Sequence, residues 1–405
     1  MQVLYKRCCG IDVHKKLLAV CLKTGKKQEL REYGTHTQNL RELADWLIEN
    51  ECEKVAMEST GNYWKPVYNV LELLGLDVMV VNAQHMKAVP GRKTDMKDAE
   101  WIADLLQHGL LKASFIPDRD QRELRDVTRY RKSLVEERAR EVNRLEKTLE
   151  GCNIKLSSIV THLTGQSSRN LIGAVLAGDV TGERIEELSY GKVKEKKDEL
   201  LLALDGVLSP IQKKLIAAIL DHIDDMTRRI SDVDNIISGE MKKYEDAIKA
   251  LDEIPGIGRH SAEVILAEIG IDMSRFPTAA HLASWAGVCP GNYESAGKRK
   301  SGRTNKGNPT LKTTLVQCAK TATKKKDTFF RAQYERISIR RGANRASMAV
   351  AHSILISIYY MLKFNQPFHD LGRDYYHQCN PERKINNYLK KLSELGWSPP
   401  VPAIA

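Results

Sequence analysis

The chain has 405 residues, 42% of them hydrophobic and 28% charged, with a net charge of +11 and a pI near 9.1. This describes a globular protein of two or three domains, and the basic surplus favours a polyanionic partner. With no apolar run near the ~20 residues of a membrane span, no signal peptide and no Cys-x-x-Cys pair, we expect an intracellular protein without a membrane partner, a disulfide framework or a zinc site.

Residues 8–110 alternate strand and helix patterns. The stretches "CCGIDV", "LLAVCLK" and "KKQELREYG" predict three strands joined by tight turns. "THTQNLRELADWLIEN" has apolar residues at helical spacing, behind a threonine that we expect to cap the helix. A buried strand "EKVAME", a helix "YWKPVYNVLELLGL", a strand "DVMVVN" and a helix that begins at Thr94 complete the region. Together they predict a mixed sheet with helices packed against it.

The rest of the chain is mainly helical in pattern. Two charged stretches, at 118–151 and about 192–250, carry apolar residues at 3-4 spacing and predict an antiparallel helical stalk, for which oligomerisation would be an additional role. We expect the region between them, 151–191, to be loose because it is rich in Gly and Ser. A helix-turn-helix, a basic Gly-rich tract and further helices follow. The predicted domains are 1–116, 117–250 and 251–405.

Four acidic residues stand where the predicted sheet would bring them together. Asp12 lies at the end of the first strand, Glu58 ends the fourth, and Asp95 and Asp98 start the closing helix. If the first and fourth strands are neighbours, the strand acids lie side by side with the helix acids opposite. Clustered carboxylates repel one another unless a divalent cation neutralises them, and hard oxygen ligands favour Mg²⁺. Two such ions about 4 Å apart are the usual arrangement for cutting phosphodiesters.

Each acid taken singly has a simpler interpretation. With Thr94 as the N-cap, Asp95 and Asp98 fall in the first helical turn, where the helix dipole favours negative charge. The strand acids alone would be caps or surface charges. The order of the four acids is the more specific pattern, and the cap and metal interpretations of the helix acids are compatible.

The stretches "GIDVHK", "AMESTGNYW" and "RKTDMKDAEWIADLL", in this order and spacing, resemble the DEDD domain of the insertion-sequence 110 family of transposases. The resemblance implies a fold similar to the RuvC resolvases and the wider ribonuclease-H-like proteins, so the fold class is α/β plus α. Matched residue by residue, it implies a catalytic tetrad that holds Mg²⁺, formed by Asp12, Glu58, Asp95 and Asp98.

Residues 254–258, "IPGIG", form a glycine turn between two helical patterns and resemble a helix-hairpin-helix. Such turns expose backbone N–H groups to phosphate, which makes Gly256 and Gly258 candidate nucleic-acid contacts. A glycine turn between helices is also an ordinary connection. The basic tract that follows favours the binding role.

That tract contains "NYESAGKRKSGRTNKGN", in which Ser295 precedes two small residues. A serine hydroxyl is inert unless it is activated, so the residues alone favour a phosphate-binding loop without a catalytic serine. The cations that would contact phosphate are Lys298, Arg299, Lys300, Arg303 and Lys306. The tract also resembles the C-terminal domain of the same family, which implies that Ser295 is the nucleophile. Ser301 and Ser59 are weaker candidates.

The resemblance covers about 8–110 and 250–345 and implies a DNA transposase that acts as a site-specific recombinase on element ends and target DNA. It also implies a structured guide RNA, a homo-oligomer (dimer or tetramer) and a prokaryotic, cytoplasmic, nucleoid-associated protein. Two alternatives stay open. One is a metal-dependent RuvC-like junction nuclease without serine chemistry, against which the serine tract argues. The other is a non-enzymatic nucleic-acid-binding protein, against which the ordered tetrad argues.

Overall fold

A computed structural model of the chain describes residues 3–59, 61–81, 95–291, 293–295, 298–378 and 381–397, with the backbone alone at 95, 293–295, 298–301, 377, 383 and 384. Its contacts divide it into two compact units, Met1–Arg122 and Glu123–Ala405. The boundary between the units falls close to the first predicted domain boundary. The division into three domains stays a prediction.

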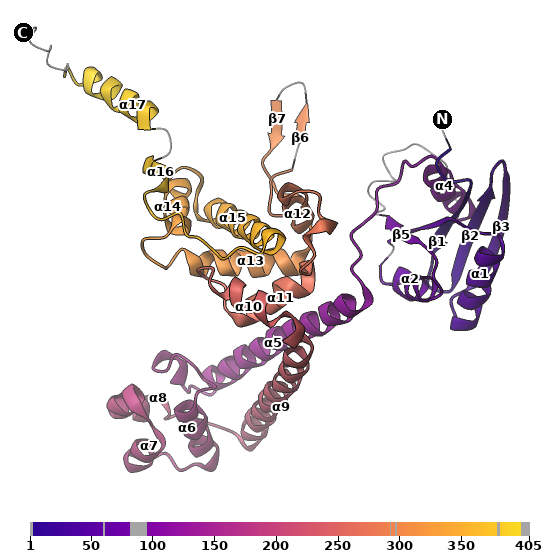
Figure 1. Ribbon diagram of the computed structural model, residues 1–405. Coiled ribbons are helices and arrows are strands. Elements are labelled where there is room, and N and C mark those ends of the chain that lie inside the picture. Colours follow the sequence, from indigo (N-terminus) through magenta and orange to yellow (C-terminus); the bar gives the residue numbers. More distant parts are fainter. Residues whose placement is uncertain are drawn as a thin grey trace, which may run out of the picture. The chain divides into compact units, whose positions relative to one another are not determined.

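The N-terminal unit is built on a five-stranded mixed sheet in the order β3-β2-β1-β4-β5 (Figure 1). The first three strands are antiparallel, and β4 and β5 run parallel to β1. The strands are β1 (Arg7–Val13), β2 (Leu17–Thr24), β3 (Lys27–Gly34), β4 (Lys54–Glu58) and β5 (Val78–Val81). The predicted mixed sheet is therefore confirmed, and its first and fourth strands are neighbours.

Helices cover both faces of this sheet. Because strand side chains alternate between faces, one face carries Ile11 and Met57 into a core with α1 (Thr37–Glu49) and α2 (Trp64–Leu73). The other face packs against α4 (Asp95–Gln107). The predicted threonine cap of α1 is wrong: His36 holds the cap position without a side-chain bond, and the Thr35 hydroxyl donates to the carbonyl of Lys15. Thr94, the predicted cap of α4, lies outside the described residues.

The backbone of α4 lies directly on β1 at Gly10. A Cβ at this position would be 2.4 Å from both the Ala99 carbonyl oxygen and the Ala103 nitrogen. Ala99 and Ala103, four residues apart, present a small surface on the same side of α4. Glycine in the strand and alanines in the helix thus allow an approach that larger side chains would prevent.

The second unit contains a pair of long helices, α5 (Arg119–Gly151) and α9 (Pro210–Met241), here called the stalk. Arg131 forms an ion pair with Asp234, and Arg138 Nε donates to Thr227 Oγ1 at 2.7 Å. Partner numbers fall along α9 as they rise along α5, so the pair is antiparallel, as predicted. A capping box of Ser209 and Gln212 starts α9.

The prediction that the segment 151–191 is loose is wrong. It contains α6 (Gln166–Ala177) and α7 (Gly182–Leu188), and α8 (Lys197–Ala203) follows. Leu163, Leu171 and Val175 are buried in a core with the ends of the stalk helices. Its glycines had indicated a loop, but Gly178 adopts the left-handed conformation that ends α6.

Helix α15 (Ala343–Phe364) packs against α10 (Glu245–Asp252), α12 (Ala279–Ala286), α13 (Pro309–Ala322) and α14 (Phe329–Arg341). By length and composition α15 could cross a membrane, contrary to the expectation from the sequence, but here it is a core helix with Val350, Ile354 and Ile358 buried. A short hairpin of β6 (Tyr293–Ser295) and β7 (Lys298–Ser301) extends beyond α12 (Figure 1). The other helices are α11 (Arg259–Ile269), α16 (Tyr375–Gln378) and α17 (Pro381–Glu394).

Replacing Gly10 with alanine is expected to force α4 away from the sheet. The clash is with backbone, so the free energy of unfolding should fall by about 1–3 kcal/mol or more, measured by urea denaturation. Gly173→Ala is the control, because a Cβ there meets open space within α6 and alanine favours a helix by roughly 1 kcal/mol. Equal stability of Gly10→Ala and the wild type would contradict the close packing.

Candidate active site

The strand ends of β1 and β4 place two acids next to each other. The parallel register pairs Ile11 with Met57, and Asp12 and Glu58 are the next residues along each strand. Since Ile11 and Met57 face α1 and α2, the acids belong to the face that α4 covers. Asp12 is 6% exposed, and Glu58 is half-buried.

Helix α4 runs antiparallel to β1 and brings its acidic start toward these strand ends. Near its carboxyl end, the Gln107 carbonyl accepts from the backbone of Leu4, ahead of β1. Ile102 and Leu106 pack against Cys8 in the first half of β1. Asp98 lies one turn before Ile102, so it is on the same side of the helix and farther toward the strand ends. Its side chain is half-buried.

The side chain of Asp95 lies outside the described part of the chain, so its place beside the other three acids stays a prediction. Among the described residues, no three His, Cys, Asp or Glu side chains are grouped closely enough to hold a metal ion. The donor chemistry nevertheless fits Mg²⁺, because Asp12, Glu58 and Asp98 offer hard carboxylate oxygens from two adjoining strand ends and one helix face.

His14 is a neighbour of the site that sequence reasoning did not single out. Its Nε2 lies 3.0 Å from Asp12 Oδ2, and its backbone N–H donates to the Leu17 carbonyl in the turn between β1 and β2. The signal available in the sequence was its position two residues after Asp12, which returns a side chain to the same face of an extended chain. His14 therefore fixes one orientation of the Asp12 carboxylate.

The cysteines of this sheet are core residues. Burial raises the pKa of the Cys8 thiol to about 12 and that of Cys21 to about 11. Neutral thiols are poor nucleophiles and poor metal ligands. The cysteines within the described ranges are free thiols, and those of the sheet serve its packing.

Ser295 is the last residue of β6, and its backbone is paired in the antiparallel register with Lys298, the first residue of β7. Below the hairpin, Gly291 N donates to the Arg303 carbonyl at 2.9 Å, and a bridge joins Pro290 to Thr304. A loop was expected for this tract, and its backbone is instead a β-hairpin. The side chains of Ser295, Lys298, Arg299 and Lys300 lie outside the described part of the chain, whereas Arg303 and Lys306 are exposed.

The glycines of the 254–258 turn have different surroundings. Gly256 has φ of +88°, and a Cβ there would be 2.3 Å from the Cys318 carbonyl oxygen, so this glycine is required for α13 to pack against the turn. Gly258 is exposed at the cap position of α11. Of the two, Gly258 has the exposure that a phosphate contact needs.

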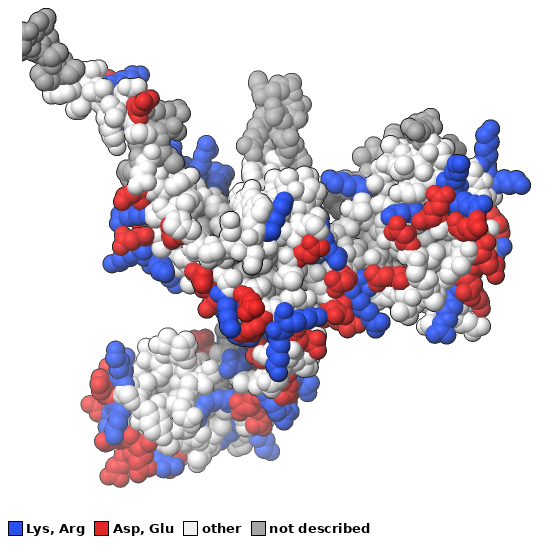
Figure 2. Space-filling view, viewed as in Figure 1, with Lys and Arg blue, Asp and Glu red and all other residues white. Residues whose placement is uncertain are grey.

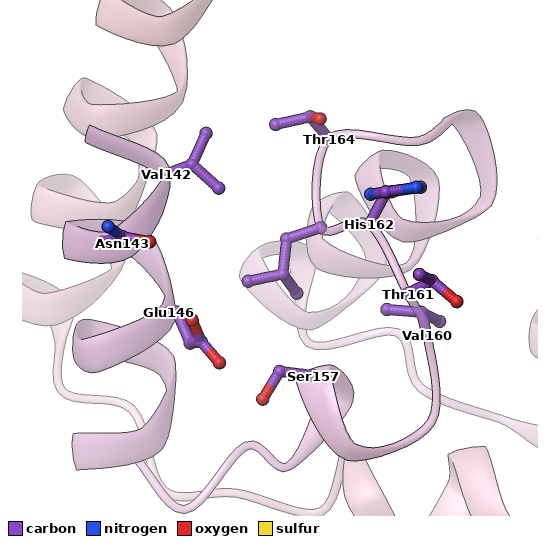
Figure 3. A pocket seen from close by; sticks show the side chains of 9 residues that line it. Val142, Asn143, Glu146, Ser157, Val160, Thr161, His162 and Thr164 are labelled. Atoms are coloured by element: carbon purple, nitrogen blue, oxygen red, sulfur yellow. The ribbon is translucent and has the colours of Figure 1, made fainter. Parts of the chain in front are cut away.

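The stalk holds a separate cavity of about 250 Å³, between α5 and the segment 157–164 (Figure 3). Val142, Asn143 and Glu146 line one side, and none of the predicted site residues reaches it. On the face shown in Figure 2, basic and acidic side chains are interspersed over the stalk. This mixture agrees with the ion pairs between α5 and α9 and gives no single-signed patch there.

Comparison with known proteins places both regions in one family. A transposase family model named for IS110 and its DEDD domain matches residues 9–154, and the model described as "Transposase IS116/IS110/IS902 family" matches 248–335. The chain belongs to the IS110 family of transposases. It is a DNA transposase.

Several relatives match this chain over most of their own length. A "Probable family 20 transposase" from Pseudomonas aeruginosa is 24% identical over 77% of this chain and 79% of its own. The "Insertion element IS116 uncharacterized 44.8 kDa protein" from Streptomyces clavuligerus is 25% identical over 60% and 69%. The "Transposase for insertion sequence element IS1328" from Yersinia enterocolitica is 23% identical over 66% and 70%.

The two matched spans of this transposase contain its two candidate sites. The first span includes the strand ends and the start of α4, and the second includes the glycine turn and the Ser295 hairpin. Neither model matches residues 155–247, which hold α6 to α9. The acid site and the hairpin are thus the parts of the chain in which a transposase function is to be sought.

The cations of the hairpin are expected to contact DNA phosphates. Replacing Lys298, Arg299 and Lys300 together with alanine should weaken binding to element-end DNA at any sequence. The slope of log affinity against log salt should fall by roughly one unit for each phosphate that the variant no longer neutralises. The control replaces Lys324, Lys325 and Lys326, exposed in the same unit, and removes the same charge. The prediction fails if the hairpin variant keeps the wild-type slope, or if the slope of the control falls as much.

Proposed function

We propose that this transposase is a site-specific recombinase that cuts and rejoins the DNA of its own insertion element, guided by a structured RNA and acting as a dimer or tetramer. The observation that supports the proposal is that Asp12 and Glu58 end neighbouring strands on the sheet face covered by α4, the helix that carries Asp98. The net charge of +11 supports binding to nucleic acids.

The proposal includes a RuvC-like, ribonuclease-H-like N-terminal domain. An antiparallel β1–β2–β3 meander followed by parallel β4 and β5 supports this fold. It also includes a stalk of coiled-coil type and a helix-hairpin-helix at 254–258. The antiparallel register of α5 and α9 and the exposure of Gly258 support these two features.

In this mechanism, the carboxylates of Asp12, Glu58, Asp95 and Asp98 bind Mg²⁺. When bound, Mg²⁺ supplies positive charge that stabilises the phosphorane-like transition state and the departing oxygen. The Asp12 carboxylate is held by its strand and by His14, so the orientation of this ligand is set in advance. The start of α4 adds the favourable end of the helix dipole for Asp95 and Asp98.

Ser295 is the proposed nucleophile. Its hydroxyl loses its proton and forms an Oγ–P bond, while the bond from that phosphorus to one deoxyribose oxygen breaks and the departing oxygen takes up a proton. Attack by a DNA hydroxyl on the phosphoserine then reverses these changes and joins the strands. Lys298, Arg299, Lys300, Arg303 and Lys306 neutralise the phosphate during both steps.

Asp98→Asn is expected to abolish transposition of a plasmid-borne element while nucleic-acid binding is retained. Without metal, the thermal midpoint should stay equal or rise, because one charge of a repelling group has been removed. Asp104→Asn is the control on the same helix. It removes an ion pair with Lys23 and should leave transposition close to the wild type. Transposition by Asp98→Asn at the wild-type rate would exclude Asp98 from the mechanism.

Ser295→Ala separates a phosphate contact from a nucleophile. Loss of one hydrogen bond would cost ~1 kcal/mol, a several-fold effect on affinity, whereas loss of the nucleophile should lower the reaction rate by many orders of magnitude. Ser295→Cys should be severely impaired as well. In wild-type cells carrying the element, rapid denaturation should trap a protein–DNA adduct that mass spectrometry assigns to Ser295.

Ser301→Ala is the control within the same hairpin, and it should form the adduct. Transposition by the wild type with no adduct at Ser295 would favour the metal-dependent nuclease over the serine mechanism.

A further inference from the structure

A fully buried carboxylate lies near the base of the Ser295 hairpin. Glu268, near the end of α11, is 0% exposed. Its two carboxylate oxygens accept from Arg129 Nε and Nη2, each at 2.8 Å, and one of them also accepts from Asn308 Nδ2 at 2.6 Å. We call Glu268, Arg129 and Asn308 the Glu268 cluster. A buried carboxylate is tolerated only when such partners are in place, so the cluster fixes the relative positions of α5, α11 and residue 308.

Asn308 is the last residue of the segment that connects β7 of the hairpin to α13. Its Oδ1 accepts from Leu311 N at 3.0 Å to cap α13, and its own N–H donates to the Trp285 carbonyl at 3.2 Å. Gly307 lies against the end of α12, where an added Cβ would be 2.3 Å from Gly287 N. The chain therefore leaves the hairpin at a point held between α12 and α13.

A second arginine of α5 also contacts the region around Asn308. Arg125, one turn before Arg129, donates Nε to the Ala267 carbonyl at 3.2 Å, and its guanidinium lies 5.5 Å from the Trp285 ring centre. The Trp285 carbonyl in turn accepts from Asn308 N. Hydrogen bonds of the buried Glu268 and of the arginines on α5 thus connect the base of the hairpin to α5, in addition to apolar packing.

We propose that Glu268, Arg129 and Asn308 are positioning residues that fix the base of the β6–β7 hairpin and thereby the orientation of Ser295 for attack on DNA. The inference rests on the proposed serine mechanism. A two-stranded hairpin holds its shape poorly without further support. Small misplacement of a reacting group costs much rate, so the hydrogen bond between Asn308 and Glu268 controls the reaction and not merely the folding of the domain.

Asn308→Asp is the sharpest single change. Aspartate caps a helix as well as asparagine does, so the start of α13 is preserved, but the donor to Glu268 becomes a second carboxylate. Glu268→Gln is a second change in the same cluster and should act in the same direction, because an amide N–H₂ in place of Oε2 would face the donors of Arg129 and Asn308. Glu263→Gln is the control, because Glu263 is also buried on α11 and pairs at 3.0 Å with Arg259 of the same helix.

The readout is the rate at which the full-length protein forms the Ser295–DNA adduct in cells carrying the element, alongside thermal midpoint and DNA affinity. Asn308→Asp should slow adduct formation about 10- to 100-fold with affinity maintained. Glu268→Gln should slow it as well, and Glu263→Gln should keep the wild-type rate even if its midpoint falls. Adduct formation at the wild-type rate by Asn308→Asp or by Glu268→Gln, or an equal loss of rate in the Glu263→Gln control, would overturn the positioning role. Absence of a Ser295 adduct in the wild type would instead defeat the serine mechanism on which the role rests.

Discussion

The contact between the α4 backbone and Gly10 is the constraint on which the acid site depends. It sets how close the helix lies to β1 and, with Ile102 and Leu106 packed on Cys8, which end of the helix faces which end of the strand. A slip of one residue in β1 would turn Asp12 into the apolar core on the other face. The position of the carboxylates is therefore a consequence of packing between small residues, and the charges themselves do not determine it.

Much of the N-terminal unit could be predicted from the sequence because its signals are local. Apolar stretches of four to eight residues indicated the buried strands, although β3 is charged and largely exposed, and 3-4 spacing indicated the helices and the stalk. The pairing of Asp12 with Glu58 followed once the first and fourth strands were taken as neighbours, and the parallel register of β1 and β4 agrees with it. The resemblance in the same stretches supplied the order of the acids.

What could not be predicted depends on residues distant in sequence or on signals that have two meanings. Glu268 contacts Arg129, which is 139 positions away in the sequence, and no local sequence pattern indicates that contact. In 151–191 the glycines and serines indicated a loop, although Leu163, Leu171 and Val175 had enough apolar surface to form a core with the stalk. The cap of α1 failed because Thr35 bonds to Lys15, a partner in the β1–β2 turn.

The two candidate sites are held in different ways. The acid site uses a five-stranded sheet with helices on both faces, a support that is rigid in itself. Ser295 lies on two short strands whose register contains a bulge, and such a pair gains little stability from its own ladder. The position of the hairpin therefore depends on contacts at its base, which are the Pro290–Thr304 bridge, the Gly287–Gly307 contact and the hydrogen bond of Asn308 to Glu268. A buried charge at this point is suited to the task, because a carboxylate without its partners is far less stable than an apolar contact slightly out of place. The cluster thus favours one arrangement of the hairpin base over its near alternatives, which apolar packing on α13 alone would distinguish less sharply.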